Sequence, residues 1–217
     1  MTEASVRALD GLRDLSMLKW YVIPLLAIVF YIYVKEIKDA KSSGNWNAVF
    51  AGLTVFGIDF FNETWNGWVL ALTGKSAFWT APGDTALRTM VGWNIEIMFM
   101  FLLSGIIWYH TCSEDPKDKI LGIPNRWFWA IGYSVFCVFV EVLLNKGGLL
   151  IWEYSFWNRS FGGVLLIFLI GYLHFYVGSI LVVSRKSIRS KVIILGIIYT
   201  IPILMNIIGY YIMGWNY

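Results

Sequence analysis

The chain has 217 residues, of which 58% are hydrophobic and only 14% are Asp, Glu, Lys or Arg. Soluble domains carry about 25% charged residues, so this composition excludes an ordinary soluble domain and indicates an integral membrane protein. The net charge of +3 is too small to favour nucleic acid as a partner. The two cysteines, Cys112 in a polar loop and Cys137 in an apolar run, predict neither a disulfide nor a metal cluster.

Residues 1–17 have apolar side chains at helical spacing, which predicts a short helix lying at the membrane interface. Apolar segments long enough to cross a bilayer then follow one another along the chain. They cover about 18–34, 47–69, 90–109, 127–144, 162–183 and 192–213. No long polar stretch separates them, so residues 1–217 are expected to form one domain. The predicted fold class is an all-α, polytopic membrane helix bundle with six transmembrane helices, seven being the alternative count.

Basic residues are concentrated in the loops that follow the first, third and fifth of these spans. The positive-inside rule places such loops in the cytoplasm, so both termini are expected outside. Arg7, Arg13 and Lys19 in the N-terminal segment reduce this contrast. The basic residues of the three loops are Lys35, Lys38, Lys41, Lys117, Lys119, Arg126, Arg185, Lys186, Arg189 and Lys191.

The connections on the opposite side are rich in Trp, Phe and Gly, as in KGGLLIWEYSFWNRSFGG. Such aromatic residues are typical of the headgroup layer, and the alternative is that these loops fold back as a lid. The segments 60–79 and 139–158 also share an order of Glu, Asn, Gly and a Trp-bearing loop. This loose internal echo is compatible with a three-helix duplication.

The second span carries a polar stripe in an apolar helix. Asp59, Asn62, Glu63 and Asn66 are spaced i, i+3, i+4 and i+7, which places them on one helix face. Polar residues of four other spans are predicted at a similar depth, and these are Asn94, Glu96, Glu141, Asn206 and, nearer the middle, His174. A charged side chain at mid-helix costs about 2.5–3.5 kcal/mol on insertion scales, so this coincidence predicts a functional site. The alternative is that the asparagines join helices by hydrogen bonds and that His174 is a core histidine.

The residue types indicate acid and base chemistry. A protonated carboxylic acid beside an ionised one is an acid–base pair, and aromatic faces stabilise cations. This combination suits protonation of an alkene or epoxide on an isoprenoid chain. We therefore expect Glu63, Glu96 and Glu141 to be catalytic and to converge on a cavity open to lipid. The expected supporting and substrate-binding residues are Asp59, Asn62, Asn66, Trp93, Asn94, His174, Asn206 and Tyr210.

Sequence signals for a cofactor or metal are weak. The chain has only two histidines, and it has no Glu-x-x-His motif, no glycine-rich phosphate loop and no Cys pair. We therefore expect no cofactor and no metal. The expected partners are a lipid-soluble substrate and membrane lipids, without nucleic acid.

The Glu63 stripe, together with a polar residue ahead of the C-terminal MNIIGYYIMGW, resembles the small membrane-integral terpene cyclases of meroterpenoid and indole-diterpene pathways. That resemblance implies that a Glu in an early span and an Asp in the last span protonate an epoxide. Glu63 matches the first position, but Asn206 occupies the second, and asparagine is not an acid. The chain is also similar to membrane carotenoid cyclases and hydratases, which use a Glu within the membrane and no redox cofactor.

Two further hypotheses use the same residues. In a small transporter or proton-coupled carrier, the carboxylates bind a cation or relay protons. In a noncatalytic subunit of a membrane complex, the polar stripe pairs with a helix of the partner.

Overall fold

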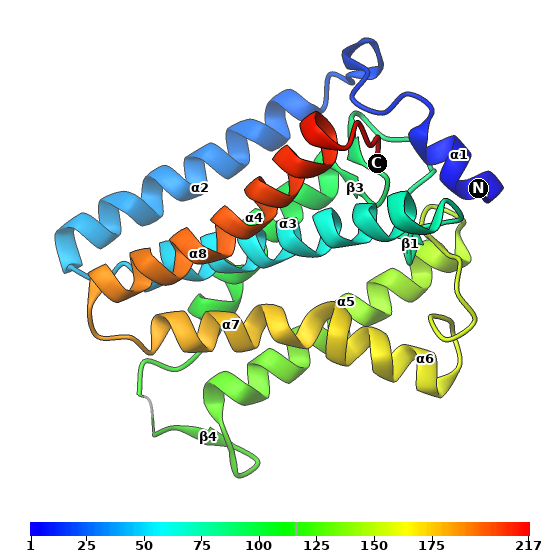
Figure 1. The fold of residues 1–217 in the computed structure, drawn as a ribbon. Coiled ribbons are helices and arrows are strands. Elements are labelled where there is room, and N and C mark those ends of the chain that lie inside the picture. The colour runs from blue at the N-terminus through cyan, green and yellow to red at the C-terminus, as the bar shows by residue number, and fades with distance from the viewer. Residues whose placement is uncertain (116) are drawn as a thin grey trace.

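The computed structural model describes residues 1–115 and 117–217 as an array of long helices with both termini at one end (Figure 1). The short α1 (Glu3–Leu9) and η1 (Leu15–Met17) precede this array. Its helices are α2 (Val22–Ser43), α3 (Asn47–Thr73), α4 (Ile95–Thr111), α5 (Asn125–Lys146), α6 (Phe161–Leu166), α7 (His174–Val183) and α8 (Ile188–Asn206). We call the end that holds the termini and segments 74–94 and 147–160 the loop end.

Each of the predicted spans overlaps a long helix, although α4 begins at Ile95, later than its predicted start. The first span was predicted to end at residue 34, whereas α2 runs from Val22 to Ser43, so Lys35, Lys38 and Lys41 lie in this helix rather than in a loop. Within residues 1–115 and 117–217, three helices are long and apolar enough to cross a membrane by length and composition: Asn125–Lys146, Phe161–Val183 and Ile188–Ile212. Ile95–Thr111 is a shorter apolar helix. The prediction of a mostly helical membrane protein is confirmed at this level.

Two of these helices contain wide π-helical turns. The segment η2 (Ile167–Leu173) joins α6 to α7, and η3 (Ile207–Ile212) extends α8. Such turns are rare and appear frequently at functional sites, because the extra residue redirects neighbouring side chains. The position of η2 beside the cavity described below makes it part of the candidate site.

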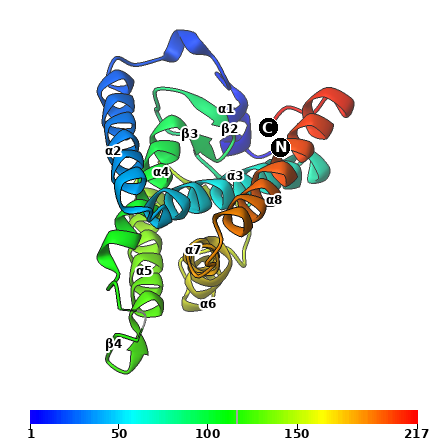
Figure 2. The same cartoon turned by 90° about the vertical axis from the view of Figure 1, so that its left-hand side faces the viewer.

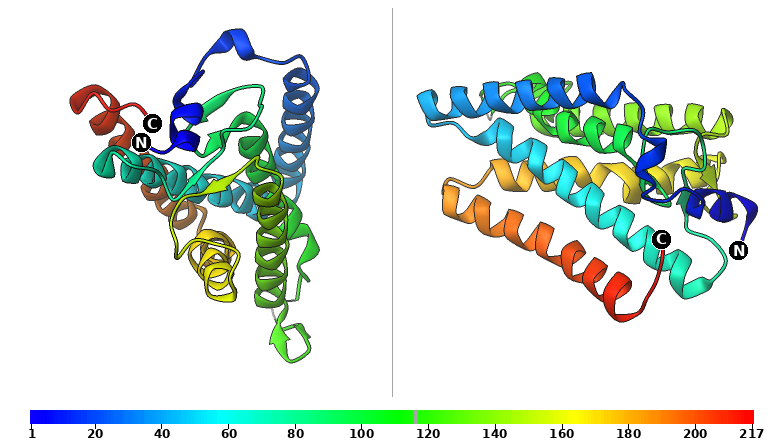
Figure 3. Two further views of the ribbon diagram at one scale, coloured as in Figure 1. Left: turned by 90° about the vertical axis from the view of Figure 1, so that its right-hand side faces the viewer. Right: turned by 90° about the horizontal axis from the view of Figure 1, so that it is seen from above.

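Helix α3 lies at the centre of the array and packs against α4, α7 and α8, as the rotated views show (Figures 2 and 3). A Cβ atom added at Gly105 of α4 would lie 2.3 Å from the Ala51 carbonyl oxygen of α3. The two helix backbones therefore touch, which is the close packing that small residues allow between membrane helices.

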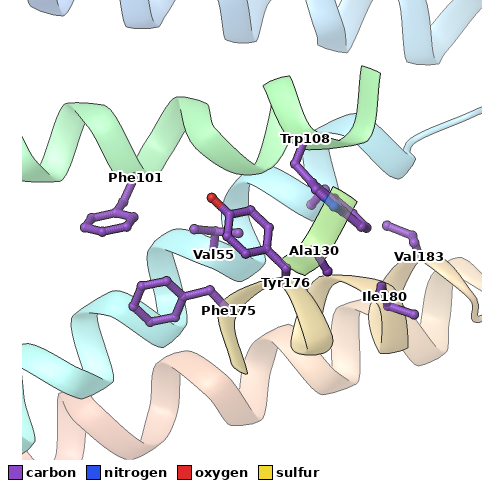
Figure 4. Close-up of a cluster of buried hydrophobic side chains, with 9 residues drawn as sticks. Val55, Phe101, Trp108, Ala130, Phe175, Tyr176, Ile180 and Val183 are labelled. Carbon is purple, nitrogen blue, oxygen red and sulfur yellow. The ribbon is translucent and has the colours of Figure 1, made fainter. Parts of the chain in front are cut away.

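The main apolar core joins four helices (Figure 4). Val55 of α3 meets Phe101 and Trp108 of α4, while Phe175 and Tyr176 come from α7. The Phe101 and Phe175 rings lie 5.2 Å apart in an edge-to-face arrangement, which is favourable for aromatic pairs. These two rings also line the cavity, so the core fixes one wall of the candidate site.

Short antiparallel strand pairs shape the loops. At the loop end, β1 (Trp79–Thr80) pairs with β6 (Ile151–Trp152), and β2 (Arg88–Met90) pairs with β3 (Trp93–Asn94). On the opposite side, β4 (Lys119–Ile120) pairs with β5 (Ile123–Pro124). The β1–β6 pair joins the two Trp-rich connections, whose Trp79 and Trp157 are buried. This arrangement supports the folded-back alternative rather than an exposed aromatic belt.

The N-terminal helix is shorter and more buried than an interfacial helix over residues 1–17 would be. Ser5 and Ala8 of α1 have no exposed surface. The Arg88 guanidinium donates hydrogen bonds to the Ala8 carbonyl at 3.4 Å and the Asp10 carbonyl at 3.1 Å. These bonds satisfy carbonyls at the end of α1 and fasten the helix to the loop end, which is why it does not lie free.

Substituting Gly105 with Ala is expected to lower the stability of the fold. The new Cβ would collide with backbone atoms of Ala51, and such overpacking costs about 1–3 kcal/mol. Thermal unfolding in detergent, followed by circular dichroism, measures the effect. Gly196→Ala is the control, because no atom lies within 4 Å of a Cβ at that position of α8. Equal melting temperatures for the two variants would contradict the proposed contact between α3 and α4.

Candidate functional site

A cavity opens between α3, α4, α5 and η2 near the loop end. Its free interior volume is about 70 Å³. Its walls are mostly apolar and aromatic, and they include Ile97, Met100, Phe101, Phe136, Val140, Leu144, Leu150, Trp157 and Phe175. The polar residues on it are Asp59, Asn62, Glu63, Glu141 and Tyr172.

Three of these polar residues are buried carboxylates, and each accepts a hydrogen bond from a tryptophan. Trp79 Nε1 lies 2.8 Å from Glu63 Oε1, and Trp93 Nε1 lies 2.8 Å from Asp59 Oδ2. Trp152 Nε1 lies 2.8 Å from Glu141 Oε1. All three donors belong to the connections at the loop end, so these loops set the orientation of the carboxylates.

No basic side chain in residues 1–115 and 117–217 forms an ion pair with these carboxylates. Asp59 and Glu63 lie one turn apart on α3, and Glu141 lines the same cavity. Oε2 of Glu63 is buried and has no hydrogen-bond partner among the described residues. Burying ionised carboxylates without a partner costs several kcal/mol each, so the site is built to hold protons or to face a cation.

The described residues contain no group of three His, Cys, Asp or Glu side chains placed to hold a metal ion.

Asn66 fixes the first loop over the cavity. Its side-chain amide donates to the Trp79 carbonyl at 2.7 Å, and its oxygen accepts from the Phe78 backbone N–H at 2.8 Å. Asn66 has no exposed surface, so these bonds satisfy backbone groups that water does not reach. The residue positions Trp79, and through it Glu63, rather than facing the cavity.

Asn145, one turn after Glu141 on α5, fixes the second loop in the same way. Its amide donates to the Leu150 carbonyl at 3.0 Å, and its oxygen accepts from Arg159 Nε at 2.6 Å. The shared order of Glu, Asn and Trp in segments 60–79 and 139–158 thus corresponds to one construction used twice. In both, the Glu binds a loop indole and the Asn binds the loop.

Asn62 and His174 meet across the helices. Asn62 Oδ1 lies 3.2 Å from His174 Nε2, and His174 Nδ1 is buried and has no partner in the part of the chain that the structure describes. Asn62 lines the cavity, whereas His174 lies outside it. Trp93 stacks between Phe56 and Phe60 at centroid distances of 5.6 and 5.5 Å, and this stacking holds its N–H on Asp59.

The expectation that Glu96 converges with Glu63 and Glu141 is wrong. Glu96 accepts hydrogen bonds from the Tyr21 hydroxyl at 2.6 Å and the Thr85 hydroxyl at 2.5 Å. It stands in the first turn of α4 and faces α2 and the loop rather than the cavity. Depth along a helix, which the sequence supplies, does not determine the direction in which a side chain points.

Asn94, Asn206 and Tyr210 also lie away from the cavity. Asn94 is the N-cap of α4 and accepts from the Ile97 N–H at 2.9 Å. Asn206 donates to the Thr64 hydroxyl at 2.7 Å and accepts from the Tyr217 hydroxyl at 3.1 Å. These bonds join α8 to α3, which is the structural alternative predicted for asparagines in membrane helices.

Sequence reasoning missed several residues of the site. Cys137 and Trp157 line the cavity. Trp152 donates to Glu141 from the loop that follows its helix, as Trp79 does for Glu63. The recurring Trp after each Glu-bearing helix was the signal that could have identified both donors.

The chain matches a family described as "Uncharacterized membrane protein family" over residues 2–211. The chain belongs to this family. An uncharacterized protein of Archaeoglobus fulgidus is 43% identical over 214 residues, which cover 99% of both chains. No solved structure matches the chain.

Asn66→Ala is expected to release the first loop from the cavity. Leaving buried backbone groups unsatisfied costs about 1–3 kcal/mol, so the amides of Phe78 and Trp79 should exchange faster with deuterium. Hydrogen-exchange mass spectrometry over residues 76–81 measures this change. Asn62→Ala, one turn earlier on α3, is the matched control because Asn62 does not bind the loop backbone. Unchanged exchange in Asn66→Ala would refute the anchoring role.

Proposed function

We propose that this protein is a cofactor-independent membrane enzyme that acts on an isoprenoid or another lipid by carboxylic acid–base catalysis. The observation that carries the proposal is that Glu63 and Glu141 line one apolar, aromatic cavity together with Asp59. In this proposal all six long helices cross the membrane, and the basic loops face the cytoplasm. The cavity then lies in the outer half of the bilayer, where a substrate can enter from the lipid.

Glu63 is assigned as the acid. Its Oε1 is engaged by Trp79, while its buried Oε2 has no partner within the described chain, so a proton on Oε2 is available to a substrate. Transfer of this proton to one carbon of an alkene forms a C–H bond and leaves a carbocation on the other carbon. With an epoxide, the proton goes to the oxygen, and the C–O bond breaks.

Glu141 is assigned as the base. It removes a proton from a carbon next to the cationic centre, and the C–H electron pair forms the new double bond. The proton gained by Glu141 balances the one lost by Glu63, so the pair is restored by proton exchange and the reaction consumes no cofactor. Tyr172 lines the cavity together with Glu141.

The cavity walls suit a cationic intermediate. Phe101, Phe175 and Trp157 present aromatic surface to the cavity, and aromatic faces attract cations by about 0.5–2 kcal/mol each. Asp59 adds a carboxylate one turn from Glu63. The apolar remainder excludes water, which would otherwise capture the cation.

The resemblance to membrane-integral terpene cyclases enters this proposal in altered form. Glu63 keeps the position of the early-span acid, whereas Asn206 is bound to Thr64 and Tyr217 and does not reach the cavity. Glu141, in the fourth long helix, takes the place of the second carboxyl group.

A proton-coupled carrier is the second candidate, because buried carboxylates without basic partners also suit cation binding or proton relay. A noncatalytic subunit is less well supported. Asp59 and Asn66 of the polar stripe are buried inside this chain, where they bind Trp93 and Trp79, so neither side chain faces a partner helix.

Glu63→Gln and Glu141→Gln are each expected to reduce turnover by about 100-fold or more, because positioned acids and bases contribute about that factor. Purified protein in lipid vesicles is incubated with farnesol, geranylgeraniol and their terminal epoxides, and products are separated by gas chromatography and identified by mass spectrometry. Glu36→Gln is the control, since Glu36 is equally buried but pairs with His110 at the other end of α2.

Proton flux into the same vesicles separates the two candidates. The enzyme proposal is supported if the wild type and Glu36→Gln convert a substrate and both cavity variants do not. Proton flux that both cavity variants abolish, in the absence of any conversion, would replace the enzyme by the carrier.

A further inference from the structure

A second hollow lies beside the carboxylate cavity, between α3 and η2. Its free volume is about 320 Å³. Phe61, Trp65, Leu169 and Ile170 line it, and each of these side chains is at least 36% exposed. They stand on apolar helices and face away from the core, where lipid surrounds a membrane protein. We call this hollow the lateral groove.

The lateral groove and the cavity share a wall. Asn62, Trp79 and Trp157 line both spaces, so the partition between them consists of side chains. At this partition, Asn62 Oδ1 lies 3.2 Å from His174 Nε2. A change of rotamer at Asn62 is enough to alter the partition without moving a helix.

The π-helical segment η2 contributes to both spaces. Leu169 and Ile170 face the lateral groove, whereas the next two residues, Gly171 and Tyr172, line the cavity. Consecutive residues of this helix therefore serve two different surfaces.

We propose that the lateral groove holds the hydrocarbon chain of a single-chain amphiphile whose positively charged end lies among Asp59, Glu63 and Glu141. This inference rests on the proposed function for the position of the reacting end. The charge follows from three buried carboxylates without a basic partner in the described chain, next to aromatic rings. The hydrocarbon chain of the ligand is inferred from the apolar groove, which is open at lipid depth. Only a partition of side chains separates this groove from the carboxylates.

An alkylammonium is the probe, because its fixed charge imitates a cationic intermediate. A dodecyltrimethylammonium analogue with a diazirine at the end of its chain is bound to the protein in nonionic detergent and activated by light. Peptide mass spectrometry then locates the label. We expect labelling of residues 61–65 and 167–173. Unlabelled dodecyltrimethylammonium should compete, and dodecanoate, which has the same chain length and the opposite charge, should not.

A groove-filling variant tests the position of the chain. Ile170→Trp is expected to reduce labelling by about tenfold, equivalent to about 1.4 kcal/mol of binding free energy. Leu181→Trp is the matched control, since Leu181 is 54% exposed and Ile170 is 55% exposed, and Leu181 does not line the groove. Equal labelling of the two variants, label spread evenly over the lipid-facing helices, or equal competition by dodecanoate would overturn the inference.

The inference and the proposed function can fail separately. The inference is supported if the groove is labelled, the unlabelled ammonium competes, and Ile170→Trp removes the label. This holds even if no prenyl alcohol or epoxide is converted. If Ile170→Trp changes neither the labelling nor the conversion seen with the wild type, the inference is overturned. The proposed enzyme activity is then unaffected.

Discussion

The hydrogen bonds between loop tryptophans and buried helix carboxylates are the interaction on which the rest of the structure depends. Trp79 and Trp152 occupy opposite positions of the β1–β6 pair, and their indoles bind Glu63 and Glu141 respectively. The same contacts hold the connections of the loop end against the cavity and orient its carboxylates. They also explain why the loops at this end are aromatic, since an indole offers one donor on a large apolar surface.

This construction leaves the negative charge of the site uncompensated by the protein. Each indole satisfies one carboxylate oxygen, but neutral donors do not cancel the cost of burying three acids in an apolar bundle. A proton or a cationic ligand completes the site. The enzyme, the carrier and the amphiphile in the lateral groove are all consequences of that same deficit, and they differ in what supplies the positive charge.

The sequence predicted the features that depend on local order. Helical periodicity placed Asp59, Asn62 and Glu63 on one face, and the 1.5 Å rise brought Glu141 to their height. Glu96 and Asn206 have similar heights but point elsewhere, because α4 is turned toward α2 and Tyr217 fills the space between α3 and α8. Helix rotation and the pairing of distant loops are set by tertiary packing, which a single sequence does not reveal.

The central claim is that the cavity accepts positive charge, and a structure determined with bound dodecyltrimethylammonium tests it most directly. The account predicts the ammonium group between Glu63 and Glu141, with the alkyl chain passing Asn62 toward Leu169 and Ile170. An empty cavity at a saturating concentration of this ligand would contradict the account. So would an ammonium group bound elsewhere while a lipid chain fills the space beside the carboxylates.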